Sequence, residues 1–426
     1  MAGYLEYKDS GIPWLGDIPA HWGIERGKNI LTLLDRPVRA DDEVITCFRD
    51  GEVTLRKNRR EEGFTLSLQE VGYQGIEPGD LVVHGMDGFA GSIGVSDSRG
   101  KATPVLNVMD SPHNKRYLMY YLRMAAYKDV FLSLSTGIRV RSCDLRWNKL
   151  AVFPFVIPKR TEQDAVVEYI DRELAKADVI IAEAKASIEE YKAWKASIIY
   201  EAVTKGLAPN VEMKDSGVEW IGEMPTTWRT MRIKDLGDAR NGLTYSPEDQ
   251  VDEGQGTLVL RSSNVQGGKL AFSDNVYVGS EIPPELILQQ GDILICSRNG
   301  SRKLIGKNAY IEEDNKYSFG AFMMALRPKI ANKKYVYWLL NSGVFGYYLP
   351  MFFTSTINQL TRENFRNMVV PYCDDELVQQ RIVEYLDAKV SKIDGIIEEK
   401  ETLVADLEAY KKALIFEVVT GKRKVV

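Results

Sequence analysis

Closely spaced cysteines and histidines are missing from this 426-residue sequence. Its four cysteines lie far apart, and its three histidines form no HExxH or other metal-binding pattern. Zinc sites and disulfide frameworks both need such spacings. The sequence therefore predicts no metal site and no disulfide framework, and it favours a reducing compartment.

Long apolar runs are missing as well. No run approaches the roughly 20 apolar residues that a helix needs to cross a membrane. The start of the chain, Met1–Asp9, is polar and does not resemble a signal peptide. We therefore expect no contact with a membrane and a cytoplasmic location.

Catalytic motifs are the third absence. The sequence holds no GxSxG turn, no Asn-Pro-Pro-aromatic tetrad of amino-methyl transfer, and no carboxylate cluster with a nearby lysine that would indicate a nuclease. The segment Gly300–Asn308 resembles a phosphate-binding loop. However, five residues separate its glycines instead of four, and Asn308 stands where Ser or Thr should bind magnesium. We therefore predict no catalytic residue, no metal ligand and no cofactor in this chain.

Positive charge is in slight deficit overall but in slight excess in two regions. The formal net charge is −5. Residues 24–158 nevertheless carry 19 basic and 17 acidic residues, and residues 229–372 carry 17 basic and 14 acidic residues. Because the field near a surface follows the local charges, each region can present a basic face to a polyanion.

Two long stretches of the chain are the same predicted helix written twice. They run from about Thr161 to Thr204 and from about Asp375 to Thr420, and they align without a gap at an offset of 216 residues. Val167-Glu168-Tyr169, for example, matches Val383-Glu384-Tyr385. A self-similarity of this length indicates a duplicated structural unit.

Apolar residues in each stretch recur at steps of four and three, which predicts one seam of a coiled coil about 60 Å long. Such a helix has no core of its own, so we expect the two to pair. The alternative is that each packs on its neighbouring domain. Thr161–Asp164 approximates a capping box for the first helix, and Asp374-Asp375 can cap the second. The seam residues predicted for helix pairing and partner docking are Leu174, Ile181, Ile188, Tyr191 and Ile198 in the first helix and Val390, Ile397, Val404, Leu407 and Leu414 in the second.

A second repeat precedes each of the two basic regions. Lys8–Trp22 matches Lys214–Trp228 at an offset of 206 residues. Glycine and proline fix turns in both copies, and two tryptophans supply large apolar anchors. We expect each copy to be a strap that packs on the following domain and also meets helix ends.

The two regions between straps and helices alternate short apolar runs with turn residues and modest helices. Gly79–Val83 and Gly291–Ile295 each indicate a turn followed by a strand, Tyr117–Lys128 a helix, and Leu150–Ile157 a closing strand. We therefore expect an α+β fold in which two α/β-type domains are separated by two long antiparallel coiled-coil helices, with a pseudo-twofold internal repeat. The expected bounds are an N-terminal strap over 1–23, a domain over 24–158, a central spacer helix over 159–206, a linker and second strap over 207–228, a second domain over 229–372 and a C-terminal spacer helix over 373–426.

Basic and amide-bearing loops occur at matching places in the two domains. Arginine and lysine neutralise phosphates, and arginine, asparagine and glutamine read base edges through paired hydrogen bonds. The alternative for each loop alone is a solvated charged surface. The candidate DNA-binding residues are Arg56, Lys57, Arg59, Arg60, Gly137, Arg139 and Arg141 in the first domain and Arg298, Asn299, Arg302, Lys303, Asn358, Gln359 and Arg362 in the second.

These motifs resemble the specificity subunit of type I restriction–modification systems over essentially the whole chain. The resemblance rests on the strap Lys-Asp-Ser-Gly…Trp-(Ile/Leu)-Gly-(Asp/Glu)-x-Pro-x-x-Trp, on Gly-Asp-(Ile/Leu)-(Leu/Val), and on the duplicated helix with its Val-Glu-Tyr-(Ile/Leu)-Asp and Glu-x-Val-Thr ends. It implies that the two domains are target recognition domains, each reading one half of a split double-stranded DNA site.

The resemblance also implies partners. The paired helices would act as a spacer and would dock two methyltransferase (modification) subunits, which use S-adenosylmethionine to methylate adenine at N6. Restriction and translocase subunits that use ATP and Mg would complete the assembly. The family's specificity subunit is not itself an enzyme.

The order of strap, domain and helix occurs twice, so the second helix should end near the first strap. We therefore expect Met1 and Val426 to lie close together. Two other functions stay open from the residues: a non-catalytic coiled-coil scaffold for protein partners, and an undetected nuclease or helicase.

Overall fold

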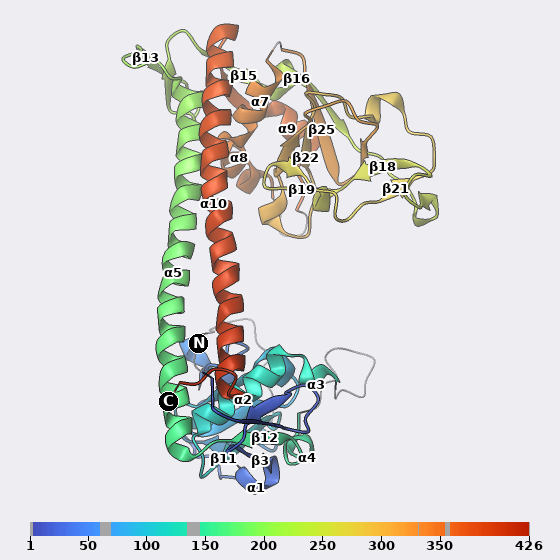
Figure 1. The fold of residues 1–426 in the computed structure, drawn as a ribbon. Coiled ribbons are helices and arrows are strands. Elements are labelled where there is room, and N and C mark those ends of the chain that lie inside the picture. The colour runs from blue at the N-terminus through green and yellow to red at the C-terminus, as the bar shows by residue number, and fades with distance from the viewer. Residues whose placement is uncertain (1–2, 60–69, 134–144, 331, 354–357, 426) are drawn as a thin grey trace. The chain divides into compact units, whose positions relative to one another are not determined.

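The structure is a computed structural model that describes residues 3–59, 70–133, 145–330, 332–353 and 358–425. It divides into two compact units (Figure 1). Unit 1 consists of Met1–Lys185 together with Glu401–Val426, and unit 2 consists of Ala186–Lys400. The two ends of the chain therefore build one unit, and the middle of the chain builds the other.

Unit 1 is built on a four-stranded antiparallel sheet in the order β4-β11-β8-β9. Strand β8 carries the predicted run Leu81-Val82-Val83, which is fully buried. Its elements are β1 (Tyr7–Asp9), β2 (Asp17–Pro19), β3 (Gly23–Arg26), α1 (Gly27–Ile30), β4 (Thr32–Leu33), β5 (Ile45–Cys47), β6 (Val53–Leu55), η1 (Arg56–Asn58), β7 (Gln74–Ile76), β8 (Leu81–His84), η2 (Gly88–Ala90), β9 (Ile93–Val95), β10 (Gly100–Ala102), β11 (Leu106–Asp110), α2 (Lys115–Tyr127), α3 (Val130–Ser133), α4 (Trp147–Leu150) and β12 (Pro154–Ile157).

Two predictions for unit 1 differ from the structure in their bounds. Helix α2 begins at Lys115 because the Asn114 side chain accepts hydrogen bonds from the backbone N–H groups of Arg116 and Tyr117. The closing strand does not begin at Leu150, since Leu150 ends the helical turn α4 and strand β12 starts only at Pro154.

Unit 2 repeats the same sheet in the order β16-β25-β22-β23 and adds a second sheet, β17-β21-β18-β24, in which β18 and β24 are parallel. Its elements are β13 (Met213–Asp215), β14 (Glu223–Pro225), β15 (Arg229–Arg232), α6 (Ile233–Leu236), β16 (Gly237–Asn241), η4 (Pro247–Asp249), β17 (Gln250–Val251), β18 (Thr257–Leu260), η5 (Ser262–Asn264), β19 (Val265–Gln266), β20 (Lys269–Leu270), β21 (Tyr277–Val278), η6 (Pro284–Leu286), β22 (Ile293–Cys296), η7 (Arg302–Leu304), β23 (Asn308–Tyr310), β24 (Ser318–Phe319), β25 (Met323–Pro328), α7 (Lys333–Leu339), η8 (Leu340–Val344), α8 (Phe345–Phe352), α9 (Arg362–Asn367) and β26 (Val369–Tyr372).

Two long helices run from one unit into the other: α5 (Arg160–Lys205) and α10 (Glu376–Val419). Each is followed closely by a glycine with positive φ, +78° at Gly206 and +71° at Gly421. Asp375 caps α10, since its carboxylate accepts hydrogen bonds from the backbone N–H groups two and three residues later.

The predicted capping box of the first helix is wrong. Helix α5 already begins at Arg160, so Thr161 lies inside its first turn. The carbonyl of Lys159 accepts hydrogen bonds from the backbone of Glu162 and Gln163, and the Gln163 side chain donates a hydrogen bond to the carbonyl of Pro158 at 2.8 Å. This buried glutamine, rather than a threonine, fixes the start of the helix.

Within each unit the segments of α5 and α10 pack side by side and run in opposite directions (Figure 1). In unit 1, Asp178 pairs with Lys411, and Lys185 pairs with Glu408 at 3.3 Å. In unit 2, Lys195 pairs with Asp394 at 2.6 Å. Most seam residues predicted from the sequence are buried and the rest are half-buried: Ile181, Ile188, Ile198, Val390, Ile397 and Leu414 are buried, and Leu174, Tyr191, Val404 and Leu407 are half-buried.

The two straps are hairpins, β1–β2 and β13–β14, that share the same internal hydrogen bonds. The backbone N–H of Gly11 donates to Asp9 Oδ1, and the backbone N–H of Gly217 donates to Asp215 Oδ1, both at 2.9 Å. Each strap also meets a helix end, as expected. Tyr7 Oη donates to the carbonyl of Gly421 at 3.1 Å in unit 1.

A different hydrogen bond joins the second strap to α5 in unit 2. Tyr200 Oη donates a hydrogen bond to the carbonyl of Ile221 at 3.0 Å. Met1 and Val426, which we expected to lie close together, fall outside the described residues. Their neighbours do meet, since Lys424 Nζ lies 6.0 Å from the ring centroid of Tyr4.

Candidate nucleic-acid interface

Two of the basic segments predicted in the second domain meet in unit 2. One is the turn that follows β22, and the other is the segment that leads into α9. Arg298 and Gln359 form an antiparallel bridge, and the backbone N–H of Leu360 donates to the carbonyl of Ser297 at 2.7 Å. Two candidate side chains, far apart in sequence, thereby lie next to each other.

Arg302 and Asn358 tie the same two segments together through their side chains. Arg302 Nε donates to Asn358 Oδ1 at 2.8 Å, and Asn358 Nδ2 donates to the carbonyl of Gly300 at 3.2 Å. The guanidinium carbon of Arg302 also lies 5.6 Å from the ring centroid of Phe353. The hydrogen-bonding groups of Asn358 are therefore largely used within the protein.

A third loop, between β24 and β25, joins this site through Phe322. Its carbonyl accepts three hydrogen bonds, from the backbone N–H groups of Ser297 and Arg298 at 3.0 and 3.1 Å and from Ser297 Oγ at 3.0 Å. The guanidinium carbon of Arg298 lies 5.1 Å from the centroid of the Phe322 ring. This ring is 57% exposed, which is unusual for a large aromatic side chain.

The three loops surround an open pocket of about 890 Å³. Sequence reasoning identified Arg298, Asn299 and Asn358 among its lining, but it missed the aromatic and hydroxyl residues. No local sequence pattern marks the missed positions. The missed lining residues with side chains suited to DNA contact are Tyr245, Arg261, Ser262, Ser263 and Phe322.

Positive charge at this site is only partly neutralised. Arg261 pairs with Asp274 at 2.7 Å. Arg298, Lys303 and Arg362 are exposed, and none of them pairs with a carboxylate within the described residues. Of these three cations, Arg298 lines the pocket, and Lys303 and Arg362 lie on the two segments that flank it.

The stretch that resembles a phosphate-binding loop has a different role. Lys307 Nζ donates hydrogen bonds to the carbonyls of Ser262 and Val265 at 2.5 and 2.9 Å. Asn308 is buried in β23 and donates to the carbonyl of Gly306 at 3.0 Å. Lys307 thus holds the segment that contains Ser262, which lines the pocket.

The basic run of unit 1 is paired locally. Arg56 donates to Thr46 Oγ1 at 3.3 Å, and Lys57 pairs with Glu43 at 2.6 Å. Arg59 pairs with Asp50 at 2.6 Å, and its guanidinium carbon lies 4.3 Å from the Phe48 ring centroid. Since nearby carboxylates offset these charges, this run is a weaker anion site than the pocket of unit 2. The remaining candidates of the first domain, Arg60, Gly137, Arg139 and Arg141, lie outside the described residues.

The Gly-Asp motif of each domain holds a buried ion pair at the start of the strand that follows the motif. Asp292 accepts hydrogen bonds from Arg327 Nε and Nη2 at 2.8 and 2.7 Å, and Asp80 pairs with Arg36 in the same way. Both aspartates also accept a hydrogen bond from the backbone three residues earlier, at 2.9 and 2.8 Å. These charges hold the turn before the central strand and are not free for a ligand.

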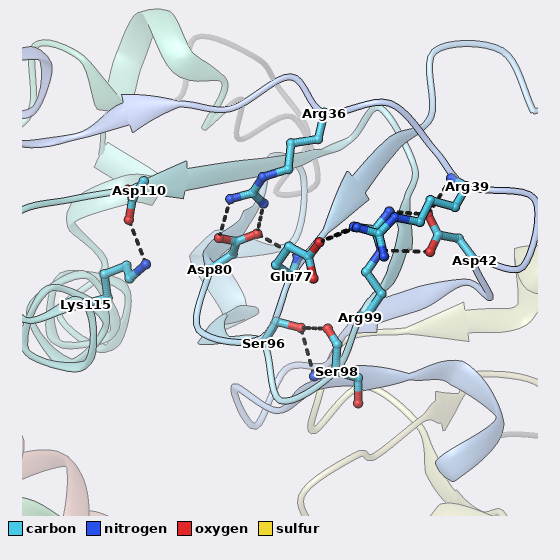
Figure 2. A network of polar contacts seen from close by, with 10 residues as sticks. All are labelled: Arg36, Arg39, Asp42, Glu77, Asp80, Ser96, Ser98, Arg99, Asp110 and Lys115. Carbon is cyan, nitrogen blue, oxygen red and sulfur yellow. Dashed lines mark hydrogen bonds and ion pairs between the residues drawn. The ribbon is translucent and has the colours of Figure 1, made fainter.

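A wider polar network surrounds the pair of unit 1 (Figure 2). Arg99 lies between Asp42 and Glu77 and donates to both oxygens of Asp42, at 2.8 and 2.9 Å. These hydrogen bonds outweigh the burial of the carboxyl and lower the pKa of Asp42 to about 2. The network therefore contributes to the stability of unit 1 as long as Asp42 is ionised.

The described residues lack two further features, a metal-binding cluster and a membrane-spanning helix. Among them, no group of three or more His, Cys, Asp or Glu side chains is arranged to hold a metal ion. No helix among them is both long and apolar enough to cross a membrane.

Comparison with known proteins identifies similar chains. Residues 225–404 match the model of a family described as the type I restriction modification DNA specificity domain. The chain is 26% identical over 206 residues to the type I restriction enzyme StySPI specificity subunit of Salmonella potsdam, a match that covers 47% of this chain and 44% of the relative. It is 23% identical over 317 residues to the MjaVIII specificity subunit of Methanocaldococcus jannaschii, covering 72% and 70% of the two chains.

A solved structure shares the fold. It comes from work on complex assembly and conformational transition of the type I R-M system, with a TM-score of 0.69, 14% identity, and coverage of 95% of this chain and 99% of that one. The resemblance to type I specificity subunits found in the sequence is therefore confirmed. The match to the first relative spans less than half of that protein's length.

Proposed function

We propose that this chain is the DNA-recognition subunit of a type I restriction–modification complex. The observation that carries the proposal is the convergence of three loops of unit 2 on one pocket, where an exposed phenylalanine contacts Arg298, which has no carboxylate partner among the described residues. Unpaired arginine and lysine suit phosphates and base edges. The family match covers the same unit.

Each unit reads one half of a bipartite site in this proposal. The four-stranded sheets β4-β11-β8-β9 and β16-β25-β22-β23 share an order, which supports equivalent placement of the loops they carry. The loops themselves differ, because unit 2 has a second sheet and unit 1 has a locally neutralised basic run. Unlike loops on equivalent scaffolds predict two unlike half-sites.

The helices α5 and α10 set the spacing between the half-sites and dock two methyltransferase subunits, paired through the seam that the sequence predicts. The partners supply the chemistry: S-adenosylmethionine-dependent methylation of adenine N6 in the methyltransferases, and ATP- and Mg-dependent steps in the restriction subunits. This chain selects the DNA and carries no catalytic residue of its own.

The test is methylome sequencing of a host that expresses this chain with its methyltransferase partner. We expect adenine methylation in a split motif with two unlike halves. An intact complex that produces no new methylation and shows no salt-sensitive affinity for duplex DNA contradicts the proposal and leaves the protein-interaction scaffold.

A further inference from the structure

We infer that Arg298 reads the major-groove edge of a guanine in the half-site bound by unit 2, and that Phe322 is the residue that positions it. The inference rests on the proposed function and goes beyond it by naming one base and the two residues that select it. The cation–π contact between these two side chains, with the guanidinium carbon of Arg298 5.1 Å from the centroid of the Phe322 ring, supports it.

The two residues form one rigid element. Both backbone N–H groups of the 297–298 turn donate to the carbonyl of Phe322, and Ser297 Oγ donates to it as well. The bridge between Arg298 and Gln359 fixes the other side of the turn. The backbones of Arg298 and Phe322 are therefore held next to each other before DNA binds, so the two side chains start from neighbouring positions.

The contact with Phe322 uses the face of the Arg298 guanidinium and leaves its N–H donors available. A guanidinium above an aromatic ring is held by its face, and its N–H groups point outward in its own plane. Arg298 has no carboxylate partner within the described residues, and both it and Phe322 are exposed at the pocket. A planar pair of donors with a fixed direction matches two adjacent acceptors.

Guanine is the base that offers this pattern. Its O6 and N7 both accept hydrogen bonds in the major groove, whereas adenine presents one acceptor and one donor there. A phosphate would not need a fixed direction, and Lys303 and Arg362, exposed and not stacked, suit that role better. The neighbouring Arg302 already donates to Asn358 and is a poorer reader.

The test couples protein variants to a single-atom change in the DNA. The complex of this chain with its methyltransferase partner is titrated with duplexes carrying the methylated site, in which 7-deazaguanine replaces each guanine of the half-sites in turn. This change removes the N7 acceptor and keeps base pairing. For the wild type we expect one guanine whose replacement weakens binding about tenfold, the scale of one bidentate contact.

The variants separate reading from positioning. Arg298→Ala should bind the normal and the substituted duplex equally, and Arg298→Lys should lose most of the discrimination because it lacks the planar fork. Phe322→Leu should reduce discrimination at the same guanine without changing the salt dependence of binding. Phe322→Tyr keeps the aromatic face and should retain the discrimination. Arg362→Ala, the matched control, should lower the salt dependence and keep the discrimination.

Three outcomes overturn the inference. They are a site without guanine, a wild type that discriminates at no guanine, and discrimination that survives in Arg298→Ala. In all three the complex still binds duplex DNA, so the proposed function stands. Absence of salt-sensitive duplex binding by the wild type is a different result, because it removes the proposed function itself.

Discussion

Asp80 and Asp292 show how one residue type can carry the same structural role in both units. The Gly-Asp-apolar pattern predicts a turn and a strand, and both form. The partners Arg36 and Arg327 lie 44 and 35 residues away in sequence, so no local pattern could identify them. A buried carboxylate needs such a partner because its isolated charge would be costly away from water.

Removing this pair should strongly destabilise unit 2. The Asp292 side chain is 2% exposed, so Asp292→Asn leaves Arg327 poorly paired and should cost about 3–5 kcal/mol of unfolding free energy. Asp238→Asn is the matched control, since its pair with Lys329 is exposed and should contribute no more than about 1 kcal/mol. Denaturant unfolding measures both, and equal losses would contradict the role given to the buried pair.

The Asp42–Arg99 pair should make unit 1 sensitive to acid. Arg99 lowers the pKa of Asp42 from 3.8 to about 2, so ionised Asp42 stabilises the fold above about pH 4, and this contribution is lost as pH falls through about 2. Asp42→Asn removes the titrating group. The difference in unfolding free energy between wild type and variant should be largest near neutral pH and should decrease between about pH 4 and pH 2. A pH-independent difference would argue against the assignment.

At the scale of elements, the strap and the helix end form one joint in each unit. Gly421, with φ +71°, lies against the first strap, and a Cβ built there would come within 2.4 Å of Pro19. Gly11, in the turn of that strap, also has a positive φ of +65° but has no atom within 4 Å of such a Cβ. Both glycines therefore share the strain of a left-handed backbone, but only Gly421 also lies too close to the strap for a side chain.

Gly421→Ala should therefore destabilise unit 1 more than Gly11→Ala does. Both substitutions place a side chain in the left-handed region, at a cost of about 1–2 kcal/mol each. Only the first also forces the strap away from the helix end. Thermal unfolding of the two variants compares them directly. Similar shifts in Tm would mean that the strap can move away from the helix end without loss of stability.

The elements also show what sequence reasoning could reach. The long helices and the two turn-strand motifs agree with the structure because each is set by periodicity or by local turn residues. The turn α4 interrupted the expected closing strand because an apolar run alone does not distinguish a buried turn from a strand. At the site, the charged loops were found, but Phe322 was not, since its exposure depends on three loops that meet only in the folded chain.

At the scale of the molecule, the first unit depends on the last residues of the chain. Leu414, Ile415, Val418 and Val419 are buried in the same core as Val166 and Ile170. Burial of a large apolar side chain contributes about 1.5–3 kcal/mol, so these four together rival the whole stability of a domain, about 5–15 kcal/mol.

A chain ending at Lys400 should therefore lose unit 1 and keep unit 2. Hydrogen exchange resolved by peptide should show β8 and β11 exchanging quickly, with β22 and β25 still protected. A chain ending at Arg423, which keeps the four buried residues, is the control and should protect both sheets. Protection of β8 in the shorter chain would show that unit 1 does not need the end of α10.

This dependence has a consequence for biosynthesis. Unit 2 is continuous in the chain, so all of its residues have been synthesised once translation passes residue 400. Unit 1, although most of it is synthesised first, must wait for residues 401–426. A premature stop codon near the end of the message would thus disable the half of the protein that was made earliest.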